Sequence, residues 1–409
     1  MNQYILLNRI KVQNANAIAG FTWGFPAITH FLGFSHNLSR KLLKTDFDTI
    51  TLTGCAVVAH NHTVHTYGPG FTAKKKELGA SDNGPPYGLG FTQSRNPPYL
   101  PSHDKASTPP VIEEGKMNMT VSLLIACEGN IGNRQDTFVT WLLKTCLLQR
   151  LAGGTLLEIG NIEICNIDDD SALRTIKRKL LPGFVLLDRS DYLAKHFSLL
   201  QQQNTNAELL NTWMDFVALK QKARPKSDLI TKHLMGGMER EVDENHNRLL
   251  ASWTKHLESS YQQQNIPQNI KDYFSAFEEN KINNKLLMQW RSYCEPTEET
   301  QADWDYLPKP ENGYLVPIMT GYKAISDLYE NHEVDNTRDN ETPVCFVETV
   351  HSIGEWLSVH RLKNVQAITD SVWHYHYEDN WYLCKQTKPT EEDDTVDEEV
   401  ITENPNDDF

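Results

Sequence analysis

The spacing of hydrophobic and polar residues along this 409-residue chain predicts a strand, a loop and a helix near its amino terminus. A β-prone apolar run, YILLNRIKV, occupies residues 4–12, and turn-forming residues between Asn14 and Gly24 then interrupt it. From Pro26 the apolar residues recur at intervals of three and four, the spacing of an amphipathic helix. These residues are Ile28, Phe31, Leu32, Phe34, Leu38 and Leu42.

Three further strands and a second helix are predicted before residue 168. Residues 47–67, 116–127 and 154–167 are rich in apolar and β-branched residues, and residues 134–151 place apolar side chains in helical register. The resulting order, β-α-β-β-α-β, is that of a ferredoxin-like domain, so we expect an α+β fold. Residues 68–115 separate the second and third strands, and we interpret them as an inserted functional element, with a variable surface loop as the alternative.

The rest of the chain divides by composition. We expect the ferredoxin-like domain to span 1–200, a mainly helical insertion 201–312, and a C-terminal α/β segment that packs on the first domain 313–388. The aromatic residues of the insertion are predicted to form a small core of its own; they are Trp253, Tyr273, Phe274, Phe277 and Trp290. The C-terminal segment contains, in order, a predicted strand over 343–351, a predicted helix over 352–362 and a predicted aromatic strand or hairpin over 371–384.

The net charge of −15 is unevenly distributed and does not exclude a nucleic-acid partner. Residues 389–409 hold ten acidic side chains and no Lys or Arg, and we expect them to form a solvated, disordered tail. Residues 1–112 hold ten Lys and Arg against five Asp and Glu. Because a local basic face governs phosphate binding, the first quarter of the chain is the expected place for such contacts.

Common catalytic and cofactor motifs are not found in the sequence. GxxxxGK[ST], GxGxxG, HExxH and paired CxxC are all missing, and the seven scattered cysteines are typical of buried, reduced thiols. His60, His62 and His65 lack a nearby carboxylate, so we expect neither a metal site nor a cofactor there. No apolar run is long enough to span a membrane and no apolar leader begins the chain, which predicts a cytoplasmic protein.

The stretch 13–43, QNANAIAGFTWGFPAITHFLGFSHNLSRKLL, holds the most specific candidate site. Its asparagine amides suit hydrogen bonds to base edges or ribose, its aromatic rings suit stacking on unpaired bases, and Arg40 suits a phosphate. The alternative for Trp23 is a place in the core. The candidate RNA-binding residues of this stretch are Asn14, Asn16, Trp23, Gly24, Phe25, His36 and Arg40.

Three motifs of the same stretch, QNANA, TWGFP and GF-x-H-x-L-x-R, resemble those of a known family. They are similar to the type I-F CRISPR surveillance-complex subunit of the Csy family, its Cas-five (Csy2-like) component of the RAMP class. Four later segments add to the resemblance: 91–97, 181–189, 313–330 and 341–361. We expect the resemblance to fail in 225–305 and after Lys388, where this chain is predicted to be longer than other members.

The resemblance implies a non-catalytic RNA-binding subunit with an RRM-like RAMP fold. Such a subunit caps the 5′ handle of the crRNA and the Cas-seven-type backbone together with the large Cas-eight-type subunit, and meets target DNA only through the complex. It also implies that 68–115 is a thumb, with Arg95 and Asn96 near its tip or base. The alternatives are a guide-RNA-processing endoribonuclease of the same fold and a protein-only scaffold.

Overall fold

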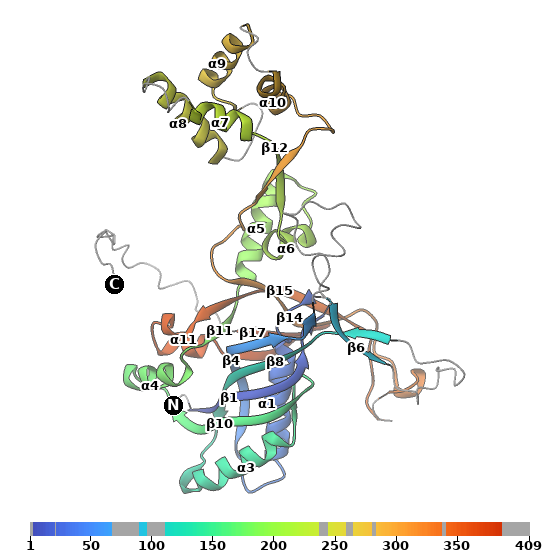
Figure 1. Ribbon diagram of the computed structural model, residues 1–409. Coiled ribbons are helices and arrows are strands. Elements are labelled where there is room, and N and C mark those ends of the chain that lie inside the picture. Colours follow the sequence, from blue (N-terminus) through green and yellow to red (C-terminus); the bar gives the residue numbers. More distant parts are fainter. Residues whose placement is uncertain are drawn as a thin grey trace. The chain divides into compact units, whose positions relative to one another are not determined.

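The computed structural model (Figure 1) describes residues 3–20, 22–67, 90–95, 111–236, 244–258, 265–279, 284–337 and 341–386. Contacts divide the chain into two compact units. The first comprises Met1–Val217 and Pro310–Phe409, and the second comprises Ala218–Lys309. The first unit combines helices with a large antiparallel sheet, which confirms the α+β class.

The four strands predicted before residue 168 all form, and they lie side by side in one antiparallel sheet. Helix α1 (Ile28–Leu42) connects the first two strands and α3 (Gln135–Leu147) connects the last two. Both helices bury apolar residues against the same face of the sheet. The spatial order is β10 (Gly154–Asn166), β1 (Gln3–Asn16), β8 (Lys116–Glu128) and β4 (Thr51–Val64).

Strand β1 continues through Asn16, so the prediction that turn residues end it near Asn14 is wrong. Asn14 instead adopts a left-handed backbone conformation, with φ of 55°, inside the strand. Its N–H donates to Asn118 Oδ1 at 3.0 Å, and the register with β8 shifts between Val12 and Ala15. Asn tolerates this conformation better than most residues, so the strand accommodates it as a bulge and resumes.

Four C-terminal strands and one strand from the middle of the chain extend the same sheet and join it back to β4. Their spatial order after β4 is β16 (Trp373–Glu378), β17 (Trp381–Gln386), β14 (Leu315–Ala324), β15 (Val347–Ser358) and β11 (Phe184–Asp188). β11 also pairs with β4, through Val185 with Val58 and Phe184 with Ala59. These six strands therefore close into a ring, and β4 belongs both to the ring and to the N-terminal sheet.

The helix predicted over 352–362 is wrong. Residues up to Ser358 continue β15, and a short 3-10 turn, η5 (Val359–Arg361), follows. β15 has β14 on one edge and β11 on the other, and the run from Ser352 to Glu355 is buried throughout. A strand enclosed in this way loses the alternation of apolar and polar residues, so its sequence cannot be distinguished from a helix by periodicity. The hairpin predicted over 371–384 is confirmed by β16 and β17.

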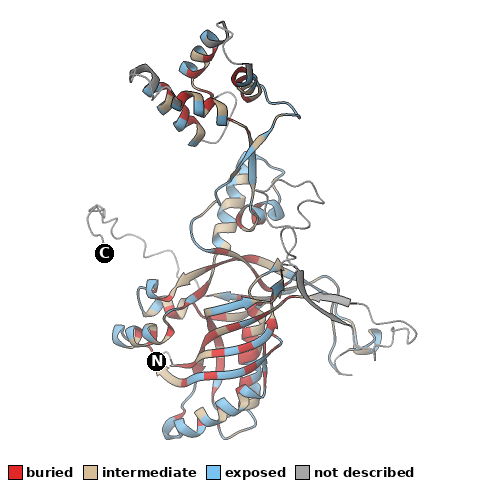
Figure 2. Ribbon diagram, in the orientation of Figure 1, coloured by how far each residue is buried: buried red, intermediate tan, exposed pale blue. Residues whose placement is uncertain are grey.

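Two apolar layers cover the two faces of the N-terminal sheet (Figure 2). Ile5 and Leu7 of β1 pack with α1 and α3, while Tyr4 and Leu6 pack on the opposite face. That opposite face is covered by α4 (Asp170–Leu180), η5 and α11 (Val365–Asp370). Because both faces are covered, the YILL run of β1 is apolar without interruption.

A buried hydroxyl joins three strands at the centre of this sheet. Ser122 of β8 is fully buried; the Arg9 N–H donates to its Oγ at 2.9 Å, and its hydroxyl donates to Asn8 Oδ1 at 3.0 Å. From β4, His60 Nε2 lies 2.6 Å from the same Oγ, and His60 Nδ1 lies 2.7 Å from the Pro182 carbonyl oxygen. Asn8 and Arg9 form a bulge in β1, and His60 forms another in β4, so Ser122 pairs with both irregular sites.

We expect Ser122→Ala to lower the free energy of unfolding by about 1–3 kcal/mol, because it leaves the buried Arg9 N–H and the His60 ring without their partner. Urea unfolding followed by circular dichroism measures the change. The matched control is Ser198→Ala on α5 (Ser190–Gln203), an exposed position whose hydroxyl bonds only to its own helix. Equal stability of the two variants would contradict a structural role for the Ser122 hydroxyl.

The second unit has its own aromatic core. Trp253, Phe274 and Trp290 are buried together with Tyr293, and the rings of Phe274 and Trp290 stack at 4.4 Å. The side chain of Phe277, also predicted for this core, lies outside the described residues. The helices are α7 (Asp228–Gly236), α8 (Glu244–Glu258), α9 (Gln268–Glu279) and α10 (Asn284–Cys294). A ribbon of β12 (Gln221–Pro225) and β13 (Ala302–Tyr306) completes this unit.

The interruption predicted over 68–115 contains part of a small antiparallel sheet. β6 (Gly90–Arg95) pairs with β5 (Thr66–Tyr67) and with β7 (Val111–Glu114). Residues 68–89 and 96–110, and the tail predicted over 389–409, lie outside the described residues. The described part of the chain contains no helix that is both long enough and apolar enough to cross a membrane.

Candidate nucleic-acid interface

The predicted loop residues have different surroundings. Asn14 is exposed, whereas Asn16 uses its amide inside the loop: its Nδ2 donates to the Ile18 carbonyl at 2.7 Å and its Oδ1 accepts from the Ile18 N–H at 3.1 Å. Asn16 therefore shapes the loop that leads to β2 (Ile18–Ala19) and β3 (Thr22–Trp23). The Asn14 side chain is therefore exposed to solvent, whereas the Asn16 amide is already hydrogen-bonded within the loop.

The two aromatic residues of TWGFP point to different environments. Trp23 is 41% exposed, and its ring lies against Gly115, where an added Cβ would come within 2.5 Å of it. Phe25 packs inward, stacked on Phe31 at 5.3 Å and edge-on to Trp356 at 4.8 Å. Gly24 lies between them in open space. Trp23 is thus the more exposed of the two rings, and Phe25 fixes the loop to the core.

Three of the four other predicted residues belong to α1 and β6. His36 and Arg40 are exposed on α1, and the His36 ring lies 6.1 Å from that of Tyr375. Arg95 ends β6, where its backbone pairs with Val111. The side chain of Arg95, and Asn96 as a whole, lie outside the described residues. These placements leave the roles of the four residues as predictions.

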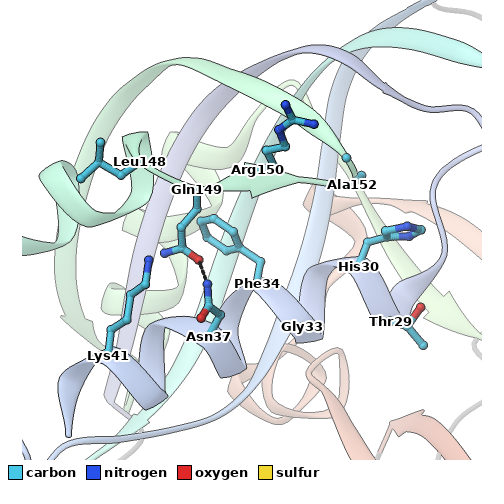
Figure 3. A pocket seen from close by; sticks show the side chains of 11 residues that line it. Thr29, His30, Gly33, Phe34, Asn37, Lys41, Leu148, Gln149, Arg150 and Ala152 are labelled. Atoms are coloured by element: carbon cyan, nitrogen blue, oxygen red, sulfur yellow. Dashed lines mark hydrogen bonds between the residues drawn. The ribbon is translucent and has the colours of Figure 1, made fainter. Parts of the chain in front are cut away.

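A polar groove runs along the other exposed side of α1 (Figure 3). It has a volume of about 350 Å³, and its α1 wall presents His30, Asn37 and Lys41 at helical spacing. The opposite wall comes from Gln149 and from Arg150 of β9 (Arg150–Leu151). Asn37 Nδ2 donates to Gln149 Oε1 at 2.6 Å, which joins the two walls.

The charge of this polar groove suits an anion. Lys41 and Arg150 reach it from different elements, and no Asp or Glu is among the described residues that line it. Burial lowers the pKa of His30 below its ordinary value, so this ring is neutral at pH 7 and forms a polar part of the wall. Neither Lys41 nor Arg150 is among the predicted RNA-binding residues, although the spacing of His30, Asn37 and Lys41 is visible in the sequence.

A second depression, the aromatic cavity, opens between the loop and the ring of strands. Its volume is about 620 Å³. The residues that characterise it are Phe25, His60, His62, Phe184, Tyr314 and Trp356. Burial lowers the pKa of His60, and the nearby Arg9 guanidinium lowers it further, against a bond to the Pro182 carbonyl. Sequence analysis identified His60 and His62 as a cluster but gave no sign that Tyr314 and Trp356 lie beside them.

Other basic and histidine clusters have structural explanations. Lys177 of α4 donates to the carbonyl oxygens of His360 and Leu362, at 2.8 and 2.7 Å, and so fixes α4 to η5. Both ring nitrogens of His60 are engaged by Pro182 and Ser122. Within the described ranges, no group of three His, Cys, Asp or Glu side chains is placed to hold a metal ion.

The fold and these surfaces define an α+β protein with a cation-lined groove and an aromatic cavity in one unit. Residues 5–233 and 239–384 match the family described as CRISPR-associated protein (Cas_Csy2). The chain is also 27% identical over 401 residues to CRISPR-associated protein Csy2 of Pseudomonas aeruginosa (strain UCBPP-PA14), across 94% of this chain and 95% of that protein. The chain belongs to the CRISPR-associated Csy2 family. The family match includes most of 225–305, so the expectation that the resemblance fails there is wrong.

Stability should fall as the pH drops below about 6.5, because burial lowers the pKa of His30 and His60 in the folded chain. The unfolded chain then takes up protons that the folded chain does not, so the free energy of unfolding decreases from 6.5 down to the folded pKa values. Thermal unfolding at pH 7.5 and 5.5 measures this loss. His60→Gln should reduce the loss, whereas the exposed control His62→Gln should not; an identical loss in both variants would contradict the assignment to His60.

Proposed function

We propose that this protein is a non-catalytic subunit of a type I-F CRISPR RNA-guided surveillance complex and binds the 5′ handle of the crRNA. The observation that carries the proposal is that Lys41 and Arg150 line the same groove, whose described lining residues include no Asp or Glu, in a chain of the CRISPR-associated Csy2 family. Two cations that line one groove suit the phosphates of a single strand. Exposed Asn14 and Trp23, on the loop that leads into α1, add groups that read and stack unpaired bases.

The arrangement of the N-terminal sheet supports a RAMP-type, ferredoxin-like fold for this half of the molecule. The strands lie in the order β10-β1-β8-β4, which is fourth, first, third, second along the β-α-β-β-α-β chain, and both helices lie on one face. Domains of this topology, including the RRM, bind single-stranded RNA. In this proposal Arg40 contacts a phosphate, and Arg95 and Asn96 act from the thumb.

The proposed partners follow from the same role. The crRNA handle occupies the groove, the Cas-seven-type backbone and the large Cas-eight-type subunit cover other surfaces, and target DNA is met through the complex. Large apolar side chains stand exposed where β14 ends and β15 begins, namely Ile325, Leu328, Phe346 and Val347. Exposed apolar groups clustered in this way are typical of subunit contacts.

Two alternative functions are less well supported. An endoribonuclease needs a reachable base or nucleophile, and the Ser122 hydroxyl beside His60 is fully buried. A protein-only scaffold gives no reason for Lys41 and Arg150 to share a groove without a carboxylate. What copurifies with the protein separates these cases, because a handle-binding subunit retains RNA of one length class.

Lys41→Ala and Arg150→Ala should each weaken handle binding and lower the slope of log affinity against log salt concentration by about 0.7, the value for one phosphate contact on a single strand. Filter binding of the full chain to handle RNA and to a scrambled strand, at several salt concentrations, measures both quantities. Lys255→Ala, an exposed lysine of α8, is the control and should leave the slope unchanged. Equal affinity for handle and scrambled RNA in the wild-type protein would sink the proposal.

A further inference from the structure

The aromatic cavity has the features of a ligand site, and the predicted RNA-binding residues of α1, His36 and Arg40, are not among the described residues that line it. Its volume of about 620 Å³ lies in the range of about 300–1,000 Å³ typical of small-ligand sites. Its walls come from the loop at Phe25, from β4, from β11 and from β14 and β15. Segments separated by some 300 residues of sequence therefore meet at one opening, within a single unit.

Aromatic rings form both the inner wall and the rim of this cavity. Phe25 and Trp356 are partly buried and meet edge to face at 4.8 Å, with an interplanar angle of 84°, so their orientations are fixed by each other. Phe184 is 48% exposed and Tyr314 is 70% exposed. Rings exposed beside a cavity in this way can gain apolar contact by stacking on a flat ligand.

Polar groups at the β4 side of the cavity suit the edge of a base. The bulge at His60 interrupts the alternation of side chains, so that His60, Asn61 and His62 all line the cavity. His60 is held by Ser122 and the Pro182 carbonyl, whereas Asn61 and His62 are exposed. The Asn61 amide offers a donor and an acceptor side by side, as the edges of nucleobases require.

We propose that the aromatic cavity binds one unpaired nucleobase of the RNA, which stacks on Tyr314 while Asn61 and His62 hydrogen-bond its edge. This inference rests on the proposed function and adds a base-reading site to the phosphate groove. An apolar peptide side chain fits less well, since it would strip water from Asn61 and His62 and replace none of their hydrogen bonds. No Asp or Glu is among the described residues that line the cavity, so an anionic strand can approach it.

Fluorescence anisotropy of the full chain with handle RNA tests the proposal. Tyr314→Ala should weaken binding about 5- to 150-fold, the effect of losing one base–aromatic stack, and Tyr314→Phe should restore it because the ring suffices. The salt slope should stay unchanged, since no phosphate contact is lost. Tyr377→Ala, at an exposed tyrosine of β16 that is 73% exposed, is the matched control and should bind like the wild type.

A series of handle RNAs, each with one abasic position, identifies the base. In the wild-type protein one position should cause a loss as large as that of Tyr314→Ala, and in Tyr314→Ala the same abasic RNA should cause no further loss. His62→Ala and Asn61→Ala give a second readout, a smaller loss confined to that position. Unchanged affinity in Tyr314→Ala, with handle still preferred over scrambled RNA, would overturn this inference and leave the proposed function standing. If the wild-type protein showed no preference for handle RNA over scrambled RNA, both this inference and the proposed function would be overturned.

Discussion

The buried hydroxyl of Ser122 constrains the geometry of the whole N-terminal sheet. It lies on the central strand β8, between a bulge in β1 at Asn8 and Arg9 and a bulge in β4 at His60. The bulge in β1 turns the Arg9 N–H away from backbone pairing, and the bulge in β4 places the His60 ring beside β8. The Ser122 hydroxyl contacts both groups. The β4 bulge turns His60 and its neighbours toward the aromatic cavity, so the surface groups depend on a polar contact in the core. Arg9 adds to this by donating to the Leu181 carbonyl at 2.9 Å, which holds the chain entering β11.

The sequence predicts the N-terminal half of the fold well because its signals are local. The strands at 4–12, 116–127 and 154–167 and the helix after Pro26 each show their own periodicity. The errors arise where tertiary contacts decide. Residues 352–355, Ser-Ile-Gly-Glu, are all buried in β15, so side chains do not alternate between a buried and an exposed face, and that burial hides the difference between strand and helix. Asn14 predicts a turn on its own, yet the Asn118 side chain accepts its N–H and keeps it inside β1.

The candidate site was predictable only in part. Asn14, Trp23 and Arg40 are exposed as an RNA-binding role requires, and Asn16 and Phe25 turn out to support the loop. Arg150 and Tyr314 had no signal, because a lone arginine after a helix and a lone tyrosine before a strand are common in any sequence. Only in the folded chain does Arg150 line the same groove as Lys41, and only there does Tyr314 line the same cavity as His62. Sequence motifs thus located the loop, whereas the surfaces around it are products of topology.

The ribbon of β12 and β13 has a consequence for how this chain can vary. The segments that enter and leave the second unit run antiparallel, and the Leu307 N–H donates to the Lys220 carbonyl at 2.9 Å, so the two ends of the inserted module meet. Because the two ends of the module lie together, its size does not change the distance between the chain segments that precede and follow it. Its helices can be lengthened, shortened or exchanged while the strands that precede and follow it keep their register. The second unit is therefore the part of this architecture in which evolution can change a surface at least cost to the rest.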